Sequence, residues 1–224
     1  ARIGGVELRG VNGAEAAALR KALPLDVGEA YRRRTVRDAV QKLEDELRQD
    51  GYFAARLRLA EPAWDAASDR VAIEVQVERG PRYQVEFHGV TEMKESDLRA
   101  RLTFRDAGAV DDTEVSTSAR EVEAAYRESG FHFVQVSGSL RRDGESRTIR
   151  FAVVEGPRVT VEEIAVSGNL AFPAKQLTGR LDTRAPGVLR SGVFRQDVLD
   201  RDLLVLTAFY RTRGFPEVAV GPAE

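Results

Sequence analysis

The sequence repeats itself at an interval of 79 residues, and no other feature constrains the fold as strongly. One set of glycines and two sets of leucines keep this interval: Gly10, Gly89 and Gly168; Leu19, Leu98 and Leu177; Leu23, Leu102 and Leu181. A glycine followed by an aromatic residue also recurs, with the third copy slipped by five residues: Gly51-Tyr52, Gly130-Phe131 and Gly214-Phe215. A fixed period of this kind indicates an array of small, similar modules.

Within each copy the hydrophobic pattern changes in the same order. A short alternating segment predicts a half-buried strand that ends at the first glycine: Val6-Glu-Leu8, Val85-Glu-Phe87 and Ile164-Ala-Val166. A short helix then carries the repeated leucines at i and i+4. A longer helix has its apolar residues at i, i+4, i+7 and i+11: Val36, Val40, Leu43 and Leu47 in the first copy, and Leu199, Leu203, Leu206 and Tyr210 in the third.

The long helix is expected to end in the same way in all three copies. A left-handed glycine after the last turn would form a Schellman motif, which brings the following aromatic residue onto the residue five positions before it. The spacing fits three pairs: Tyr52 with Leu47, Phe131 with Tyr126, and Phe215 with Tyr210.

Two strands are predicted to close each copy. The first has Ala55 and Leu57 on one face and Arg56 and Arg58 on the other. The second is denser in β-branched residues, as a central strand would be: Val71, Ile73, Val75 and Val77 in the first copy, and Ile149, Phe151 and Val153 in the second.

The pattern as a whole predicts an α+β protein of three tandem βααββ modules. Each would have a small mixed three-stranded sheet with two helices on one face, and the third module would lack its last strand. The expected boundaries are 1–79, 80–155 and 156–224. Gly80-Pro81-Arg82 and Gly156-Pro157-Arg158 are short links, so neighbouring modules are expected to abut. The third copy has an enlarged loop at Thr183 to Gly187.

Composition narrows the function classes. The formal net charge is −2 with mixed signs along the chain, which argues against nucleic acid as a partner. The sequence has no cysteine, so disulfides and thiolate metal sites are excluded. No apolar run is long enough to cross a bilayer. The chain begins at Ala1 and not at a methionine, and we expect a processed or excised piece of a longer protein.

The order of elements resembles the polypeptide-transport-associated (POTRA) domain over essentially the whole chain. Three segments carry the resemblance: Val153-Val-Glu-Gly-Pro157, Ile164-Ala-Val-Ser-Gly-Asn169 and Ala208-Phe-Tyr-Arg-Thr-Arg-Gly-Phe215. The first copy departs by having Arg79 where the second has Glu155, a position expected to face solvent.

The resemblance implies a function as well as a fold. It implies modules in the periplasm of a Gram-negative bacterium, or an equivalent space in an organelle. They would precede a C-terminal outer-membrane β-barrel of the BamA/TamA kind, receive unfolded outer-membrane protein chains, and dock accessory periplasmic proteins or lipoproteins. Fold analogy alone does not establish such a function. Two alternatives stay open, namely the POTRA arm of a two-partner secretion transporter and a structural cell-division protein with a POTRA-type domain.

The fold suggests a mechanism that does not depend on the family. A three-stranded sheet leaves an edge strand whose backbone groups can accept an extended peptide with little sequence specificity. In the POTRA family this edge is the first strand of the closing hairpin. The candidate residues are Ala55, Arg56, Leu57, Arg58 and Leu59; Phe133, Val134, Gln135, Val136 and Ser137; and Glu217, Val218, Ala219 and Val220. Edges that are merely solvated are the alternative.

The third copy carries an additional apolar stripe on its long helix. Val198, Val205 and Phe209 follow i, i+7 and i+11, whereas the aligned residues of the other copies are polar or small. An exposed stripe would mark an interaction surface. The alternative is that the loop at Thr183 to Gly187 covers it.

No residue set predicts catalysis, a metal or a cofactor. His88 and His132 lie in different copies, without a second ligand at metal-binding spacing. Asp111-Asp112 and Glu162-Glu163 are expected at a turn and in a strand. Arg32-Arg-Arg34 is either a solvated helix start or a patch for an anionic partner, and both interpretations stay open.

Overall fold

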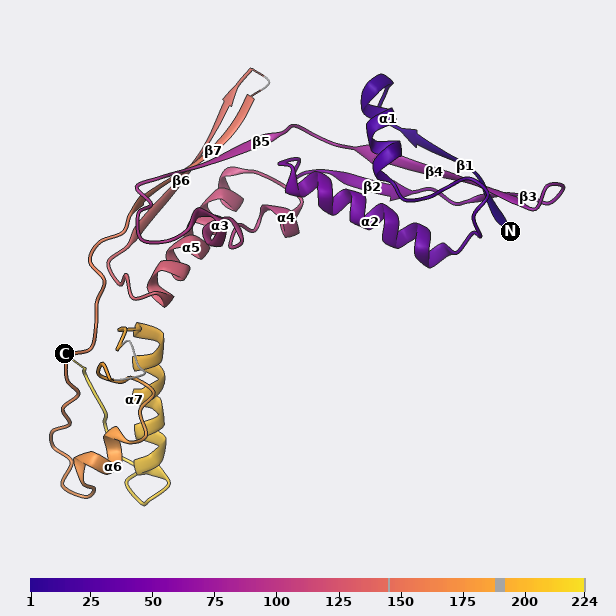
Figure 1. Cartoon of the computed structure of the whole chain (residues 1–224). Coiled ribbons are helices and arrows are strands. Elements are labelled where there is room, and N and C mark those ends of the chain that lie inside the picture. Colours follow the sequence, from indigo (N-terminus) through magenta and orange to yellow (C-terminus); the bar gives the residue numbers. More distant parts are fainter. Residues whose placement is uncertain (145, 188–191, 224) are drawn as a thin grey trace. The chain divides into compact units, whose positions relative to one another are not determined.

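The structure of the chain is a computed structural model that describes residues 1–144, 146–187 and 192–223 (Figure 1). The chain divides into two compact units. The first comprises Ala1–His88, Arg101–Ala119 and Ser137–Ala152, and the second comprises Gly89–Ala100, Arg120–Val136 and Val153–Glu224. The second copy of the repeat therefore contributes residues to both units.

The first module has the predicted order of elements, with one addition. Its elements are β1 (Arg2–Arg9), α1 (Gly13–Ala22), α2 (Arg33–Gln49), β2 (Arg56–Leu59), β3 (Ala63–Asp65) and β4 (Arg70–Glu78). The sheet order is β1-β4-β2, in which β1 is parallel and β2 antiparallel to β4. The short strand β3 also pairs with β4 and was not predicted.

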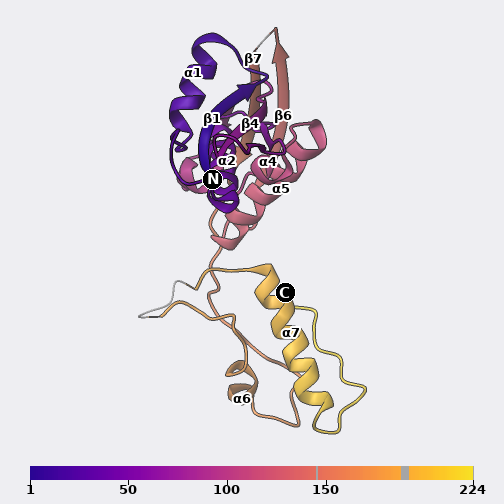
Figure 2. The same ribbon diagram turned by 90° about the vertical axis from the view of Figure 1, so that its right-hand side faces the viewer.

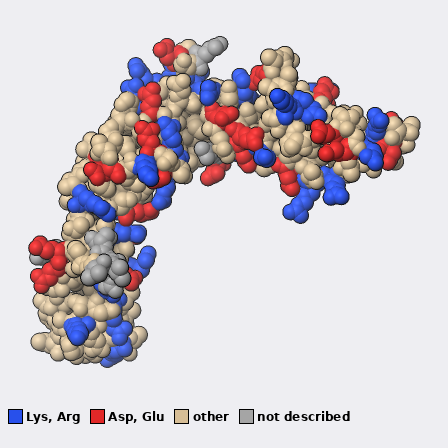
Figure 3. Space-filling view, viewed as in Figure 1, with Lys and Arg blue, Asp and Glu red and all other residues tan. Residues whose placement is uncertain are grey.

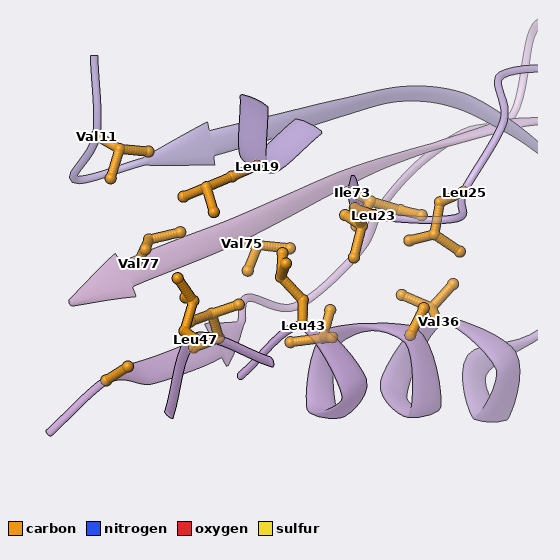
Figure 4. Close-up of a cluster of buried hydrophobic side chains, with 14 of the residues drawn as sticks. Val11, Leu19, Leu23, Leu25, Val36, Leu43, Leu47, Ile73, Val75 and Val77 are labelled. Atoms are coloured by element: carbon orange, nitrogen blue, oxygen red, sulfur yellow. The ribbon is translucent and has the colours of Figure 1, made fainter. Parts of the chain in front are cut away.

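The core of this module lies between the sheet and both helices. Strand β4 buries every second residue, Val71, Ile73, Val75 and Val77. Figure 4 shows side chains from β4, α1 and α2 pointing toward one another, among them Val75, Leu19 and Leu43. Because the strand alternates while both helices contribute to the same cluster, one face of the sheet is covered and the other faces outward.

The second module repeats this topology. Its elements are β5 (Tyr83–His88), α3 (Glu95–Arg99), α4 (Phe104–Ala107), α5 (Asp112–Glu128), β6 (Gln135–Asp143) and β7 (Ser146–Val154). The sheet order is β5-β7-β6, with β5 parallel to β7. In the first compact unit Phe151 contacts the rings of Phe87 and Phe104, with centroids 5.2 and 6.3 Å apart. In the second unit Tyr126 and Phe131 meet edge to face.

The third module contains α6 (Ala174–Thr178) and α7 (Gln196–Arg211). Among its described residues, the buried hydrophobic cluster is formed by Leu177, Leu181, Leu206 and Phe209. Two segments predicted as strands, 164–166 and 217–220, are not strands in the structure, and Figure 2 draws the chain beside α6 and α7 without arrows. In the other modules both corresponding strands pair with the closing strand, β4 or β7. The described residues of the third module include no such strand, so these segments have no ladder partner.

A hollow of about 330 Å³ lies in the third module, whose described residues include no central strand. It is lined by the opening segment around Ile164, by Leu199 and Leu203 of α7, and by residues 218–223. Gly168 is consistent with this opening, because a Cβ added there would meet nothing within 4 Å. At the aligned Gly10 a Cβ would instead collide with the backbone of Val77 in β4.

All three long helices end as the glycine spacing predicts. The amide of each aromatic residue donates to the carbonyl five positions before it: Tyr52 to Leu47 at 3.0 Å, Phe131 to Tyr126 at 3.0 Å and Phe215 to Tyr210 at 3.2 Å. The preceding glycines have φ values of +96°, +97° and +91°. These bonds are those of a Schellman motif, and the prediction is confirmed. The equivalent helix residues Leu43, Val122 and Leu206 are all buried.

The two links between modules are held by the same pair of hydrogen bonds. At the first link Arg82 Nε donates to the carbonyl of Asp50 at 2.9 Å, and the Tyr83 amide donates to Gly51 at 2.9 Å. At the second link the corresponding bonds join Arg158 to Ser129 at 3.1 Å and Val159 to Gly130 at 2.8 Å. At both links, the glycine that ends the long helix therefore also accepts a hydrogen bond from the first strand or extended segment of the next module.

Candidate polypeptide-binding edges

Two of the three predicted edge segments belong to edge strands. The sheet paths end at β2 in the first module and at β6 in the second. Ala55 directly precedes β2, while Phe133 and Val134 precede β6, which begins at Gln135. The side chains of Arg56, Arg58, Gln135 and Ser137 are exposed, and Ala55, Leu57 and Val134 are buried.

The edge of the first module is contacted by two side chains from α2. The Leu57 amide donates to Glu44 Oε2 at 2.6 Å. The Ala55 carbonyl accepts from Arg48 Nε at 3.2 Å and from Nη2 at 3.1 Å. Glu44 and Arg48, one helical turn apart, form an ion pair at 2.7 Å. We call these two side chains the α2 clip.

The edge of the second module is longer and is contacted differently. Strand β6 has nine residues, whereas β2 has four. Glu123 and Arg127 align with the two residues of the α2 clip, and they form an ion pair with each other. In the described part of the chain neither of them makes a hydrogen bond to the β6 backbone. The sequence shows a Glu-Arg pair at i and i+4 in both copies. It does not show that the pair in the first copy makes hydrogen bonds to the edge strand.

The third predicted edge is not a strand. Glu217, Val218, Ala219 and Val220 lie outside any strand, for the reason given above for the third module. Val218 and Val220 are half-buried and line the hollow beside α7.

The predicted stripe on α7 is not a continuous exposed surface. Val205 is 41% exposed and Val198 is half-buried, but Phe209 is only 5% exposed. The ring of Phe209 lies 5.0 Å from that of Phe172, and the guanidinium groups of Arg180 and Arg213 lie over it. The segment around α6 covers this side of α7. The expectation that Phe209 is exposed is therefore wrong, because α7 turns Leu206 and Phe209 together into its core.

Glu155 is buried, which corrects the expectation that its position faces solvent. Residues 149, 151, 153 and 155 share one face of the strand pattern, so the alternation that buries Val153 also turns Glu155 inward. Its carboxylate accepts hydrogen bonds from the amides of Thr91 and Glu92 at 2.8 and 3.0 Å, from the Thr91 hydroxyl, and from the Tyr126 hydroxyl at 2.7 Å. Burial alone would raise the pKa of Glu155, but these donors outweigh it and lower the pKa to about 2.

The same burial acts on Tyr126. Burial, and then the hydrogen bond to the Glu155 carboxylate, raise the pKa of the Tyr126 hydroxyl above its usual value. This hydroxyl therefore acts as a donor to Glu155 at physiological pH. In the first module the aligned Arg79 instead pairs with Glu15 at 2.5 Å and lies over the Tyr52 ring.

Three further polar residues that the sequence singles out, Asp111, His88 and His132, have structural contacts. The Asp111 carboxylate accepts the Glu114 amide at 2.8 Å and so caps the start of α5. His88 lies 3.5 Å from Glu86 on the surface, and His132 packs edge to face on Phe133 and Phe194. Among the described residues no group of three or more His, Cys, Asp or Glu is placed to hold a metal ion. None of the described helices is long and apolar enough to cross a membrane.

Charges of both signs are mixed on the surface. On the face that Figure 3 shows, Lys and Arg atoms are interspersed with Asp and Glu atoms along the first two modules. In α2, charges of opposite sign are paired across one helical turn, Arg34 with Asp38 and Lys42 with Glu46. Among the described residues on this face the two signs of charge are mixed, which does not favour the steering of a polyanion.

The architecture, tandem small mixed sheets with two or more helices on one face, defines a class of repeat-built domains that present edge strands. The family model described as "POTRA: Surface antigen variable number repeat" matches residues 1–80, 83–156 and 159–224. Because these matches cover nearly the whole sequence, the chain belongs to the POTRA family.

Curated relatives place these repeats beside those of BamA-type proteins. A "Putative outer membrane protein assembly factor" of Treponema pallidum (strain Nichols) is 22% identical over 170 residues, which are 75% of this chain and 20% of that protein. The "Outer membrane protein assembly factor BamA" of Nitratidesulfovibrio vulgaris is 20% identical over 177 residues, which are 76% of this chain and 22% of that protein. The chain thus spans about a fifth of the length of each relative.

The chain is also similar, at low sequence identity, to solved structures. The crystal structure of Haemophilus influenzae BamA POTRA3-5 is 15% identical, with a TM-score of 0.41, and the match covers 96% of this chain and 86% of that chain. The N-terminal domain of Omp85 from the cyanobacterium Thermosynechococcus elongatus is also 15% identical, with a TM-score of 0.35, covering 93% and 86%. The chain consists of tandem POTRA repeats similar to those of BamA-like proteins.

Proposed function

We propose that this chain is the periplasmic scaffold of an outer-membrane β-barrel assembly or translocation protein. In this proposal it receives unfolded client chains by strand addition, docks accessory proteins or lipoproteins, and precedes a barrel in the parent protein. Membership of the POTRA family and the names of the curated relatives support the scaffold role. The role is one of binding and not of catalysis.

One observation carries the proposal of strand addition. Strand β6 is the last strand on its sheet path and runs for nine residues, so its outer backbone groups are free of strand partners among the described elements. An edge of this kind binds an extended chain through backbone hydrogen bonds, which do not depend on a particular client sequence.

Site-specific photo-crosslinking tests this function. A photo-reactive residue at Ser137 in β6 is expected to crosslink to an unfolded outer-membrane barrel protein. The same residue at Glu121, which is exposed on α5, serves as the control and is expected to crosslink weakly. Equal yields at the two positions, or no crosslink from Ser137 to a client that binds elsewhere, would contradict strand addition at this edge.

A further inference from the structure

The first two modules do not offer their edge strands equally. We propose that a client strand adds to β6 of the second module, and that the α2 clip, Glu44 and Arg48, closes β2 of the first module to such addition. The inference rests on the proposed function, because it assigns strand addition to one edge and explains its exclusion from another.

The α2 clip already occupies the groups that an added strand would need. A peptide adding to β2 must accept the Leu57 amide and donate to the Ala55 carbonyl. Glu44 accepts this amide at 2.6 Å, and Arg48 donates to this carbonyl at 3.1 and 3.2 Å. Each of these hydrogen bonds involves a charged group, and such bonds are stronger than the neutral hydrogen bonds that a peptide backbone would make.

Displacing the clip would also be unfavourable for the two side chains. Glu44 and Arg48 are only 13% and 17% exposed, and they pair with each other at 2.7 Å. A peptide that removed their backbone partners would leave two mostly buried charges with fewer hydrogen bonds. The α2 clip therefore opposes strand addition in two ways. It occupies the backbone groups of β2, and its own charged side chains would lose hydrogen bonds if a peptide displaced them.

Strand β2 offers little outer edge even without the clip. Amide groups alternate in direction along a strand, so the residues that face outward with Leu57 are every second one. In the four residues Arg56–Leu59 only Leu59 shares its direction. Pro62 follows shortly after the strand and has no amide to donate, which is a common way of blunting an edge.

Strand β6 has the opposite properties. Ser137, Gly138 and Ser139 give its first half small side chains, and no proline interrupts its nine residues. In the described part of the chain, no side chain makes a hydrogen bond to the backbone of residues 134–140. Glu123 and Arg127, the counterparts of the clip, bond to each other instead.

A neighbouring aromatic residue indicates which chemistry the partner has. Phe133, two residues before β6, is 62% exposed, and the first module has the small Ala54 at the aligned position. An extended segment with apolar side chains at alternate positions would place one of them on this ring while its backbone pairs with β6. This alternation is the pattern of a strand in a membrane barrel.

Amide hydrogen exchange of the 224-residue chain by NMR tests the inference. The probe is a ten-residue synthetic peptide with alternating apolar and polar residues, added to the wild type, to Glu44→Ala and to Glu46→Ala. Glu46 lies on the same helix and pairs with Lys42, so Glu46→Ala is the matched control. In the wild type we expect alternate amides of β6 to be slowed at least tenfold by the peptide, with β2 unchanged. In Glu44→Ala we expect the Leu57 amide to be slowed as well, whereas Glu46→Ala should match the wild type.

The outcomes separate this inference from the proposed function. Equal protection of β2 and β6 in the wild type would leave strand addition standing and overturn the assignment to β6. A folded Glu44→Ala chain whose β2 stays unprotected would show that the clip is not what closes this edge. Should Glu44→Ala disturb α2, Glu44→Gln keeps the side chain's shape and is expected to give a smaller change of the same kind. Binding with no protected edge in any chain would instead contradict the proposed function.

Discussion

At one position of the long helices, the side chain matches the hydrogen-bonding needs of the backbone that it faces. In the second module the buried Ser118 hydroxyl accepts the Thr103 amide at 3.1 Å. In the third module the buried Asp202 carboxylate accepts the amides of Asp182 and Thr183 at 2.7 and 2.8 Å. A buried polar side chain without a hydrogen-bond partner costs about 1–3 kcal/mol, and these bonds give the buried Ser118 and Asp202 side chains their partners.

The first module shows the reverse case. The residues that align with Ser118 and Thr103 are Ala39 and Pro24. Proline has no amide hydrogen, so no acceptor is needed from the helix, and the buried alanine is sufficient. The alignment of the copies shows that a polar helix residue occurs where the facing residue has an amide, and an alanine where it is proline. The hydrogen bonds in the structure explain this correlation.

Glu155 provides a pH-dependent test at the same scale. Its pKa falls from the usual 4.5 to about 2 in the folded chain. A group with a lowered folded pKa stabilises the fold above its unfolded pKa, and this stabilisation is lost as the pH falls through the folded pKa. We therefore expect the Glu155 network to contribute on the order of 3 kcal/mol near pH 6 and progressively less between about pH 5 and pH 2.

The measurement compares Glu155→Gln with the wild type. Hydrogen exchange at the Thr91 and Glu92 amides should show a large loss of protection in the variant at pH 6 and a small one near pH 2. Glu92→Gln changes a nearby exposed carboxylate and keeps the backbone donor, so it should behave like the wild type. A loss in Glu155→Gln that is independent of pH would contradict the assignment.

At the scale of elements, helices could be predicted from the sequence better than strands. The long helices and their Schellman ends depend on residues within two turns, such as Leu47, Gly51 and Tyr52, and all three ends form. The inward direction of Glu155 also follows from the alternation, because residues 149, 151, 153 and 155 share one face of the strand, contrary to the expectation that this position faces solvent. Local signals of this kind need no knowledge of distant partners.

The strands of the third module show why the rest could not be predicted. Segment 217–220 has the alternation of a strand, but a strand exists only when another strand pairs with it. The exposed and buried sides of α7 also depend on distant residues and differ from the prediction. Phe209 packs on Phe172, while Leu203 lines a hollow. The α2 clip likewise depends on where Glu44 lies relative to Leu57, thirteen residues away in the chain.

The glycines that end the long helices allow two effects of an added Cβ to be measured separately, namely backbone strain at positive φ and collision with neighbouring atoms. Gly51 and Gly214 have φ values of +96° and +91°, so alanine is strained at both. A Cβ at Gly51 would lie 2.6 Å from the Tyr83 carbonyl oxygen, whereas at Gly214 it would meet nothing within 4 Å. We expect Gly214→Ala to cost about 1 kcal/mol, from backbone strain alone, and Gly51→Ala to cost clearly more. Hydrogen exchange in the last turns of α7 and α2 measures the two losses, and equal losses would contradict the role of the collision.

At the scale of the whole molecule, the cores of the first and third modules are separate. The buried cluster of the first module runs from Ile3 to Val77, and that of the third from Leu177 to Phe209, so they share no residue. The compact units divide the second module, and the boundaries expected at 79/80 and 155/156 stay a prediction. Separate cores imply that a defect in one terminal module need not reach the other.

Two equivalent leucines test this independence. Leu43 and Leu206 are 3% and 5% exposed at aligned positions of α2 and α7. Truncation of either one to alanine is expected to cost about 2–5 kcal/mol within its own module, through lost contacts and the cavity left behind. Leu43→Ala should lower the exchange protection of α2 and leave that of α7 unchanged, and Leu206→Ala should do the reverse. In the double variant each helix should lose what it loses in the single variant, to within about 0.5 kcal/mol, because the sites share no packing partner. If Leu43→Ala also weakened α7, the terminal modules would unfold as one cooperative body, and an edge strand in one of them could not be altered without affecting the other.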